Sequence, residues 1–207
     1  MKFNFKIQQY QTDAVEAIAK VFAGQGYYDK TTYIRDIGKR QKAQQMLLSV
    51  DESTAEYIDL EDDTGYKNEM IELSDEQLLS NIREIQSANN IKQSSDIIKD
   101  LGRCSLDIEM ETGTGKTYVY IKTMFELNKR YGWSKFIVVV PSIAIREGVK
   151  KSFEITSDHF MEHYGKKARF FVYNSANLNQ LDNFASGSGI NVMIINTQAF
   201  ASSLKED

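Results

Sequence analysis

Residues 109–117 read Glu-Met-Glu-Thr-Gly-Thr-Gly-Lys-Thr, and this stretch decides the fold. It follows an alternating apolar run and precedes a helical pattern. Glycines let the backbone curl so that successive N–H groups point at a polyphosphate, and the following helix adds the positive end of its dipole. Lys116 can reach the β- and γ-phosphates, and the Thr117 hydroxyl can hold Mg²⁺. The stretch therefore predicts a loop that binds a nucleoside triphosphate.

The loop departs from the general pattern G-x-x-x-x-G-K-[ST] at one position, where this chain has Met110 in place of the first glycine. Residues 112–117, Thr-Gly-Thr-Gly-Lys-Thr, are intact, and Gly113 supplies an internal glycine. Nucleic-acid-dependent motors use this variant. The alternative is a glycine-rich turn followed by Lys-Thr by chance, and the strand and helix signals on either side disfavour it.

The sequence from residue 104 onward alternates between strand and helix patterns. The apolar residues Leu106, Ile108 and Met110 alternate with acidic residues and predict a strand before the loop. Residues 117–130 are apolar nearly all round, which suits a helix packed against a sheet. Residues 136–140, Phe-Ile-Val-Val-Val, are a continuous apolar run typical of a strand buried on both faces in a parallel sheet.

A helix over residues 143–153 and strands over residues 169–173 and 190–195 complete the pattern. It predicts right-handed βαβ crossovers in a doubly wound α/β domain. Ligands of such domains bind at the carboxyl ends of the strands. The phosphate loop, Pro141-Ser142 and residues 196–198 all follow predicted strands, so we expect them to share one edge.

The first hundred residues carry two helical patterns. In residues 1–24, apolar residues recur at helical spacing, Asp13 and Glu16 suggest a capping box, and Gly24 marks the end. Residues 25–100 read as an insertion, partly helical and partly mobile. Within it a helix begins at Ser74, with a capping-box glutamine at Gln77 and an apolar face formed by Leu78, Ile82 and Ile85.

Composition bounds the class of protein. With 207 residues, 42% of them hydrophobic, the chain can form one sizeable globular domain. The single cysteine, Cys104, excludes an internal disulfide and fits a reducing compartment, so we expect a cytoplasmic protein with Cys104 as a packed core thiol. No apolar stretch approaches the ~20 residues of a transmembrane helix, and we expect no membrane contact.

The charges are distributed unevenly around a net charge of −4. Residues 51–76 contain eleven acidic residues and one basic residue, whereas residues 116–169 contain eleven basic and five acidic residues. A basic segment beside the phosphate loop could contact a second polyanion. The alternative is a solvated surface of mixed charge.

Four segments together resemble the N-terminal part of the restriction subunit of type III restriction–modification enzymes, in helicase superfamily 2. They are residues 9–15, 110–117, 139–149 and 194–200, and the most specific is Pro-Ser-Ile-Ala-Ile-Arg-Glu, residues 141–147. The resemblance implies a partial RecA-like P-loop NTPase domain, a parallel sheet flanked by helices with a mostly helical or mobile insertion. Residues 1–24 would form an adenine-reading helix, residues 25–100 the acidic insertion, and residues 101–207 the N-terminal half of the first RecA-like domain.

The resemblance also implies site residues, with ATP and Mg²⁺ as ligands. Nucleotide binding falls to Gln11, Thr112, Gly113, Thr114, Gly115, Lys116 and Thr117, with Lys116 and Thr117 catalytic and Thr117 on Mg²⁺. Contacts to the DNA backbone fall to Pro141, Ser142, Arg146, Thr197 and Gln198. By sequence alone, Gln11 could instead be a turn residue, Arg146 a helix-surface charge, and Thr197 and Gln198 ordinary surface residues.

The implied activity of the parent protein is ATP-driven translocation on double-stranded DNA, with a methyltransferase subunit as partner and a C-terminal endonuclease domain. The acidic Asp-Glu-x-His motif of such motors is not found before residue 207. We therefore expect the chain by itself to show negligible hydrolysis and no DNA cleavage. Alternatives are another superfamily 2 helicase, such as a repair helicase, and a non-catalytic ATP-sensing module that docks through its acidic insertion.

A rival motif lies at residues 159–163, His-Phe-Met-Glu-His, which fits the inverted zinc-protease pattern H-x-x-E-H. His159 and His163 are the only two histidines, and a catalytic zinc needs a third protein ligand. The segment is interpreted as a polar helix end, and residues 186–189, Ser-Gly-Ser-Gly, as a loop.

Overall fold

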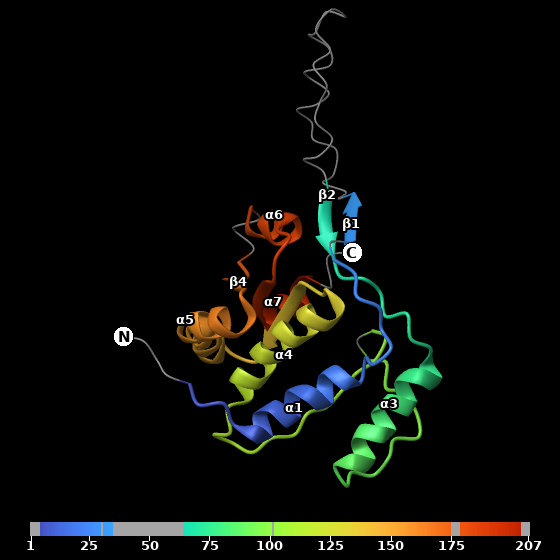
Figure 1. The fold of residues 1–207 in the computed structure, drawn as a ribbon. Helices are drawn as coiled ribbons and strands as arrows, with labels where there is room; N and C mark the ends of the chain where they lie inside the picture. Colours follow the sequence, from blue (N-terminus) through green and yellow to red (C-terminus); the bar gives the residue numbers. More distant parts are fainter. Residues whose placement is uncertain (1–4, 30, 35–63, 101, 175–178, 204–207) are drawn as a thin grey trace, which may run out of the picture.

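Figure 1 shows the fold in a computed structural model, which describes residues 5–29, 31–34, 64–100, 102–174 and 179–203. The predicted insertion therefore lies partly outside the described residues, over residues 35–63. The elements in chain order are α1 (Gln9–Lys20), β1 (Thr31–Ile34), β2 (Thr64–Lys67), α3 (Asp75–Ala88), α4 (Lys116–Tyr131), β3 (Lys135–Val140), α5 (Ile143–Tyr164), β4 (Arg169–Val172), α6 (Asn179–Ser186), β5 (Asn191–Asn196) and α7 (Thr197–Ser203).

The central sheet has three parallel strands in the order β3-β5-β4. In the register, Val140 of β3 lies opposite Asn196 of β5, and Val172 of β4 lies opposite Ile194. The middle strand β5 carries the most deeply buried side chains, with Val192 and Ile194 at 0% exposure. The three strands predicted after residue 130 are confirmed, and so is the α/β fold.

Helices α4 and α5 pack against the sheet and build the main core. Ile121 and Phe125 of α4 join Phe160 of α5 and the buried face of β5 in one apolar cluster. The Phe125 and Phe160 rings stack with centroids 4.7 Å apart. The nearly all-round apolar character of α4 follows from its place, because it also lies against α1 on its outer side (Figure 1).

A second apolar cluster joins the first hundred residues to the end of α4. Phe22, which follows α1, contacts the ring of Trp133 edge-on with centroids 5.0 Å apart. Leu78 of α3 is fully buried in the same cluster. The capping box at Ser74 and Gln77 is confirmed, since the Ser74 hydroxyl accepts the Gln77 N–H and the Gln77 side chain accepts the Ser74 N–H.

The predicted capping box at Asp13 is wrong, because the residue before α1 is Gln8, five positions earlier. Gln8 is the extended residue before the helix, and its carbonyl oxygen accepts the Thr12 N–H at 3.2 Å. Asp13 lies inside the helix, where its carboxylate accepts a hydrogen bond from the Gln9 side chain at 2.8 Å. The Asp13 carboxylate therefore forms a hydrogen bond on the surface of α1 and does not cap its N-terminus.

The strand predicted over residues 106–110 is also wrong. These residues are without assigned secondary structure, and the segment runs beside α1 toward the start of α4 (Figure 1). Leu106 and Cys104 pack against the second apolar cluster, which contains Trp133 and is called the Trp133 cluster below, while Ile108 is 45% exposed. Alternation predicts which side chains can be buried together, but a strand also needs a neighbour that accepts its backbone hydrogen bonds.

The prediction that residues 136–140 are buried on both faces fails for the same reason. β3 is an outer strand of the described sheet, and Ile137 and Val139 on one face are 50% and 41% exposed. Val140 on the other face is buried against α4 and α5. At the start of β3, the Asn68 side chain accepts the N–H groups of Ser134 and Lys135 at 2.7 and 2.9 Å, which ties the end of β2 to the central sheet.

Candidate functional site

The predicted phosphate loop leads directly into α4. Gly113 and Gly115 have φ angles of +84° and +86°, in the left-handed region that glycine adopts without strain. Gly115 is also the N-cap of α4, and no side chain caps the helix there. The first N–H groups of a helix have no partner within the helix. The start of α4 therefore offers uncapped donors and the positive end of the helix dipole.

The loop is exposed along most of its length. Thr112, Gly113 and Lys116 are exposed, and Thr117 is half-buried. Thr114 closes a turn inside the loop, since its N–H and its hydroxyl both donate to the Glu111 carbonyl oxygen, at 3.4 and 2.6 Å. The Thr114 amide is thus engaged within the loop itself, whereas the donors at the start of α4 are not used by a cap.

Helix α1 places Gln11 against this loop. The Gln11 amide nitrogen donates to the Thr114 carbonyl oxygen at 2.9 Å, and the Tyr10 hydroxyl donates to the same oxygen at 3.2 Å. A Cβ atom at Gly115 would lie 2.5 Å from the Gln11 amide nitrogen. The loop needs glycine at this position both for its φ angle and for the approach of Gln11. Sequence reasoning found Gln11 only by resemblance, and it missed Tyr10.

These residues fit a nucleotide and its metal ion. Two left-handed glycines, an uncapped helix start and an exposed lysine are the components of a phosphate cradle. The Thr117 hydroxyl at the first turn of α4 is an oxygen ligand of the kind that Mg²⁺ prefers. The bound ion would neutralise charge on the phosphate oxygens.

The structure brings together most of the residues predicted to contact DNA. Because β3 and β5 are parallel neighbours with Val140 opposite Asn196, Pro141-Ser142 and Thr197-Gln198 emerge side by side from the carboxyl ends of the strands. Ser142 is the N-cap of α5, and its hydroxyl accepts the Ile145 N–H at 3.3 Å.

Two of the predicted contact residues, Arg146 and Gln198, have partners within the chain. The Arg146 guanidinium donates to the neighbouring Glu147 carboxylate at 3.2 Å. The Gln198 side-chain oxygen accepts a hydrogen bond from the Asn196 amide at 3.0 Å. Thr197 and Gln198 form the start of α7, a helix that the sequence reasoning did not predict.

His159 has a structural role, and the His163 ring lies beside it with centroids 4.3 Å apart. His159 lies on α5, is 8% exposed, and its Nε2 is 2.9 Å from the Tyr118 hydroxyl on α4. Burial and the neighbouring His163 lower the pKa of His159. Among the described residues, no group of three or more His, Cys, Asp or Glu side chains could hold a metal ion. Residues 159–163 do form the end of a helix, since α5 ends at Tyr164, but the segment is not polar throughout, because the His159 ring packs in the α4–α5 interface.

The parallel sheet flanked by helices, with a glycine-rich loop opening α4, defines a RecA-like P-loop domain. Residues 4–207 match the family described as "Type III restriction enzyme, res subunit", and the chain belongs to this family. Among curated proteins, it is 39% identical over 110 residues to the Type III restriction-modification enzyme EcoP15I Res subunit of Escherichia coli. It is 36% identical over 110 residues to the EcoPI Res subunit of Escherichia phage P1, and 48% identical over 64 residues to the StyLTI Res subunit of Salmonella typhimurium.

These matches cover a limited part of each protein. The first two span 52% of this chain and 11% of the relative, and the third spans 31% and 6%. The aligned region is therefore about a tenth or less of the length of these Res subunits. Among the described residues, none of the helices is both long enough and apolar enough to cross a membrane.

Proposed function

We propose that this chain is the nucleotide-binding part of an ATP-driven motor that moves a type III restriction enzyme along double-stranded DNA. The observation that carries the proposal is the approach of Gln11 to the Thr114 carbonyl oxygen, at 2.9 Å, beside two glycines with positive φ. This approach supports the proposal, because a side chain that could read a base lies beside a loop that could bind phosphates. A chance glycine-rich turn would require no such neighbour.

The amide chemistry of Gln11 suits adenine. A glutamine side chain has two N–H donors and one carbonyl acceptor. One donor is used on Thr114, which leaves one donor for adenine N7 and the acceptor for the adenine N6 amino group. Guanine carries a carbonyl oxygen in place of that amino group. The Gln11 side-chain oxygen would then lie opposite the guanine oxygen, and two acceptors cannot form a hydrogen bond. Gln11 therefore favours ATP over GTP.

Lys116 would bind the phosphates of the nucleotide, and Thr117 would bind its metal ion. The Lys116 ammonium, exposed at the start of α4, would hold the β- and γ-phosphates and offset charge that develops there during transfer. Thr117 would hold Mg²⁺ through its hydroxyl, and the N–H groups around Gly113 and Gly115 would orient the phosphate oxygens. Hydrolysis by residues 1–207 alone is not expected and is checked by phosphate release.

The strand ends would contact DNA. Pro141, Ser142, Arg146, Thr197 and Gln198 lie on β3–α5 and β5–α7 connections or the first turns after them, where backbone N–H groups and hydroxyls can hold DNA phosphates without reading sequence. The names of the relatives describe restriction-modification enzymes, and we propose a methyltransferase subunit as the partner that supplies target recognition.

In the proposed division, residues 1–24 carry the adenine-reading helix, residues 25–100 are an insertion, and residues 101–207 form part of the first RecA-like domain. The insertion packs against the segments on either side of it, because side chains of α3, of the end of α1 and of the end of α4 share the Trp133 cluster.

Calorimetric titration with Mg·ATP tests the nucleotide site. Lys116→Ala removes the charge that meets the phosphates, and we expect its binding of Mg·ATP to fall below detection. Lys129→Ala is the matched control, because Lys129 is exposed in the last turn of the same helix. Equal affinity in Lys116→Ala and the wild type would refute the site.

Salt dependence tests the DNA contacts. We expect weak binding to duplexes of any sequence, with affinity that falls steeply as salt rises, since phosphate contacts release counterions. Arg146→Ala should weaken binding to all duplexes alike and reduce the salt slope by about one contact. Binding that does not change between low and high salt would argue against phosphate contacts.

A further inference from the structure

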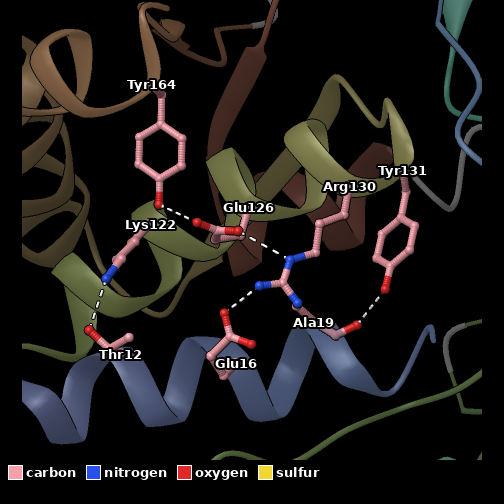
Figure 2. Close-up of polar contacts among 8 residues, drawn as sticks. All are labelled: Thr12, Glu16, Ala19, Lys122, Glu126, Arg130, Tyr131 and Tyr164. Carbon is pink, nitrogen blue, oxygen red and sulfur yellow. Dashed lines mark hydrogen bonds and ion pairs between the residues drawn. The ribbon is translucent and has the colours of Figure 1, made fainter.

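The interface between α1 and α4 is bridged by polar contacts that the nucleotide site does not use. Figure 2 shows them as three connections along the length of the two helices. Lys122 reaches Thr12, Arg130 reaches Glu16, and the Tyr131 hydroxyl donates to the Ala19 carbonyl oxygen at 2.8 Å. Interdigitated side chains already resist the sliding of one helix along another, and directional contacts add a further constraint on the register.

The first connection holds a buried lysine. Lys122 is 8% exposed, and its Nζ donates to the Thr12 hydroxyl oxygen at 3.0 Å. Among the described residues, that hydroxyl is its one hydrogen-bond acceptor. Lys122 lies among the buried residues of α4, where an ammonium is costly unless it is paired. Thr12 directly follows Gln11, so the contact fixes the part of α1 that carries the proposed adenine reader.

The second connection is anchored on a third helix. Arg130 pairs with Glu16 of α1 and, through its Nε at 3.2 Å, with Glu126 one turn back on α4. The other oxygen of Glu126 accepts the Tyr164 hydroxyl of α5 at 2.8 Å. Burial and the hydrogen bond to Glu126 raise the pKa of Tyr164, so its hydroxyl stays a donor. Glu126, itself held by Tyr164, therefore orients the guanidinium toward α1 (Figure 2).

We propose that Lys122 and Arg130 are positioning residues that fix the axial register of α1 on α4 and thereby set the selectivity of the site for adenine. The inference rests on the proposed function, because it takes Gln11 as the adenine reader. The phosphate loop and Lys116 are continuous with α4, so a shift of α1 moves the base-reading amide further than it moves the phosphate cradle, which touches α1 through the Thr114 carbonyl oxygen. A slide of one helical turn is about 5.4 Å.

The mechanism separates base recognition from phosphate binding. If the Thr12 contact is lost, α1 can adopt neighbouring positions, and the Gln11 amide meets adenine in only part of the population. The affinity for ATP then falls, while the affinities for GTP and for tripolyphosphate, which do not use this amide, stay the same. A loss of general stability would instead lower all three.

The test compares three variants of the full chain by calorimetry with Mg·ATP, Mg·GTP and Mg·tripolyphosphate. Thr12→Val has nearly the same shape as threonine but cannot accept the Lys122 hydrogen bond, and Thr12→Ser keeps the hydroxyl. Arg130→Met removes the second connection. We expect Thr12→Val and Arg130→Met to reduce the preference for ATP over GTP by about 2- to 10-fold, the loss that follows from one hydrogen bond. Thr12→Ser should retain the wild-type preference.

Thermal melting of each variant confirms that it is folded at the temperature of the titration. Equal weakening of all three ligands would overturn the inference and leave a purely structural role. An unchanged ATP preference in Thr12→Val and Arg130→Met would also overturn it, with the proposed function intact. If the wild type binds neither Mg·ATP nor Mg·tripolyphosphate, the proposed function fails, and this inference fails with it.

Discussion

Gly113 and Gly115 provide a matched pair of substitutions in one loop. Their φ angles differ by only 2°, at +84° and +86°, so alanine should cost about 1–2 kcal/mol of backbone strain at either position. Their surroundings differ, however. A Cβ at Gly113 would meet nothing within 4 Å, whereas a Cβ at Gly115 would lie 2.5 Å from the Gln11 amide nitrogen.

The difference between the two substitutions isolates the contact of Gln11. In Gly115→Ala the flexible end of Gln11 must move away, and its hydrogen bond to the Thr114 carbonyl oxygen is lost. One such bond contributes about 0.5–1.5 kcal/mol. Without nucleotide, Gly115→Ala should therefore be less stable than Gly113→Ala by about 1 kcal/mol, or roughly 2–4 °C in melting temperature for a chain of this size.

Urea unfolding followed by the fluorescence of Trp133, the only tryptophan and a buried one, gives the free energy of unfolding. In a Gln11→Ala background, Gly113→Ala and Gly115→Ala should be equally destabilising, because the group displaced by the Cβ is gone. Equal costs of the two alanines in the wild-type background would refute the placement of Gln11 beside the loop.

Three further predictions concern the scaffold. Ser74→Ala should lower stability by about 1 kcal/mol in urea unfolding, because the capping box of α3 loses its hydroxyl acceptor. Gly132→Ala should cost about 2–5 kcal/mol, since its φ is +79° and its Cβ would run into the backbone carbonyl oxygen of Tyr28, whereas Gly165→Ala, with φ +65° and open space, should cost only about 1–2 kcal/mol. The third prediction concerns the pH dependence of stability. Burial lowers the pKa of His159 from its ordinary value of 6.5. As the pH drops, the unfolded chain therefore binds the proton before the folded chain does, and stability falls as pH drops through about 6.5. The stability of His159→Gln measured between about pH 7 and 5.5 should vary less, and an equal pH dependence of the two proteins would contradict the assignment.

The sequence was sufficient for the parts of the fold that depend on local pattern. Ser74 with Gln77 specified a helix start, and the apolar run over residues 136–140 specified a parallel strand, because in both cases the information lies within a few residues. The phosphate loop was predictable for the same reason. Its glycines are dictated by backbone geometry that no other residue adopts freely.

What could not be predicted depends on partners distant in the sequence. The alternation at Leu106 gave no sign that its neighbours would be α1 and Trp133 in place of a strand. Tyr10 and Thr12 were missed because their partners, Thr114 and Lys122, are about a hundred residues away. The available signal was a lysine within a helix of mostly apolar composition, since a buried ammonium requires an acceptor.

Helix α5 is one unbroken rod of 22 residues, about 33 Å long at 1.5 Å per residue. Tyr164 pins one end to Glu126, while Ser142 stands at the other end, where the strands finish. Val149 and Phe153, in the half of the helix nearer Ser142, are buried in the main core, so this end is held as well. The rigid helix therefore sets the distance between the α4 contact at Tyr164 and the strand ends beside Ser142.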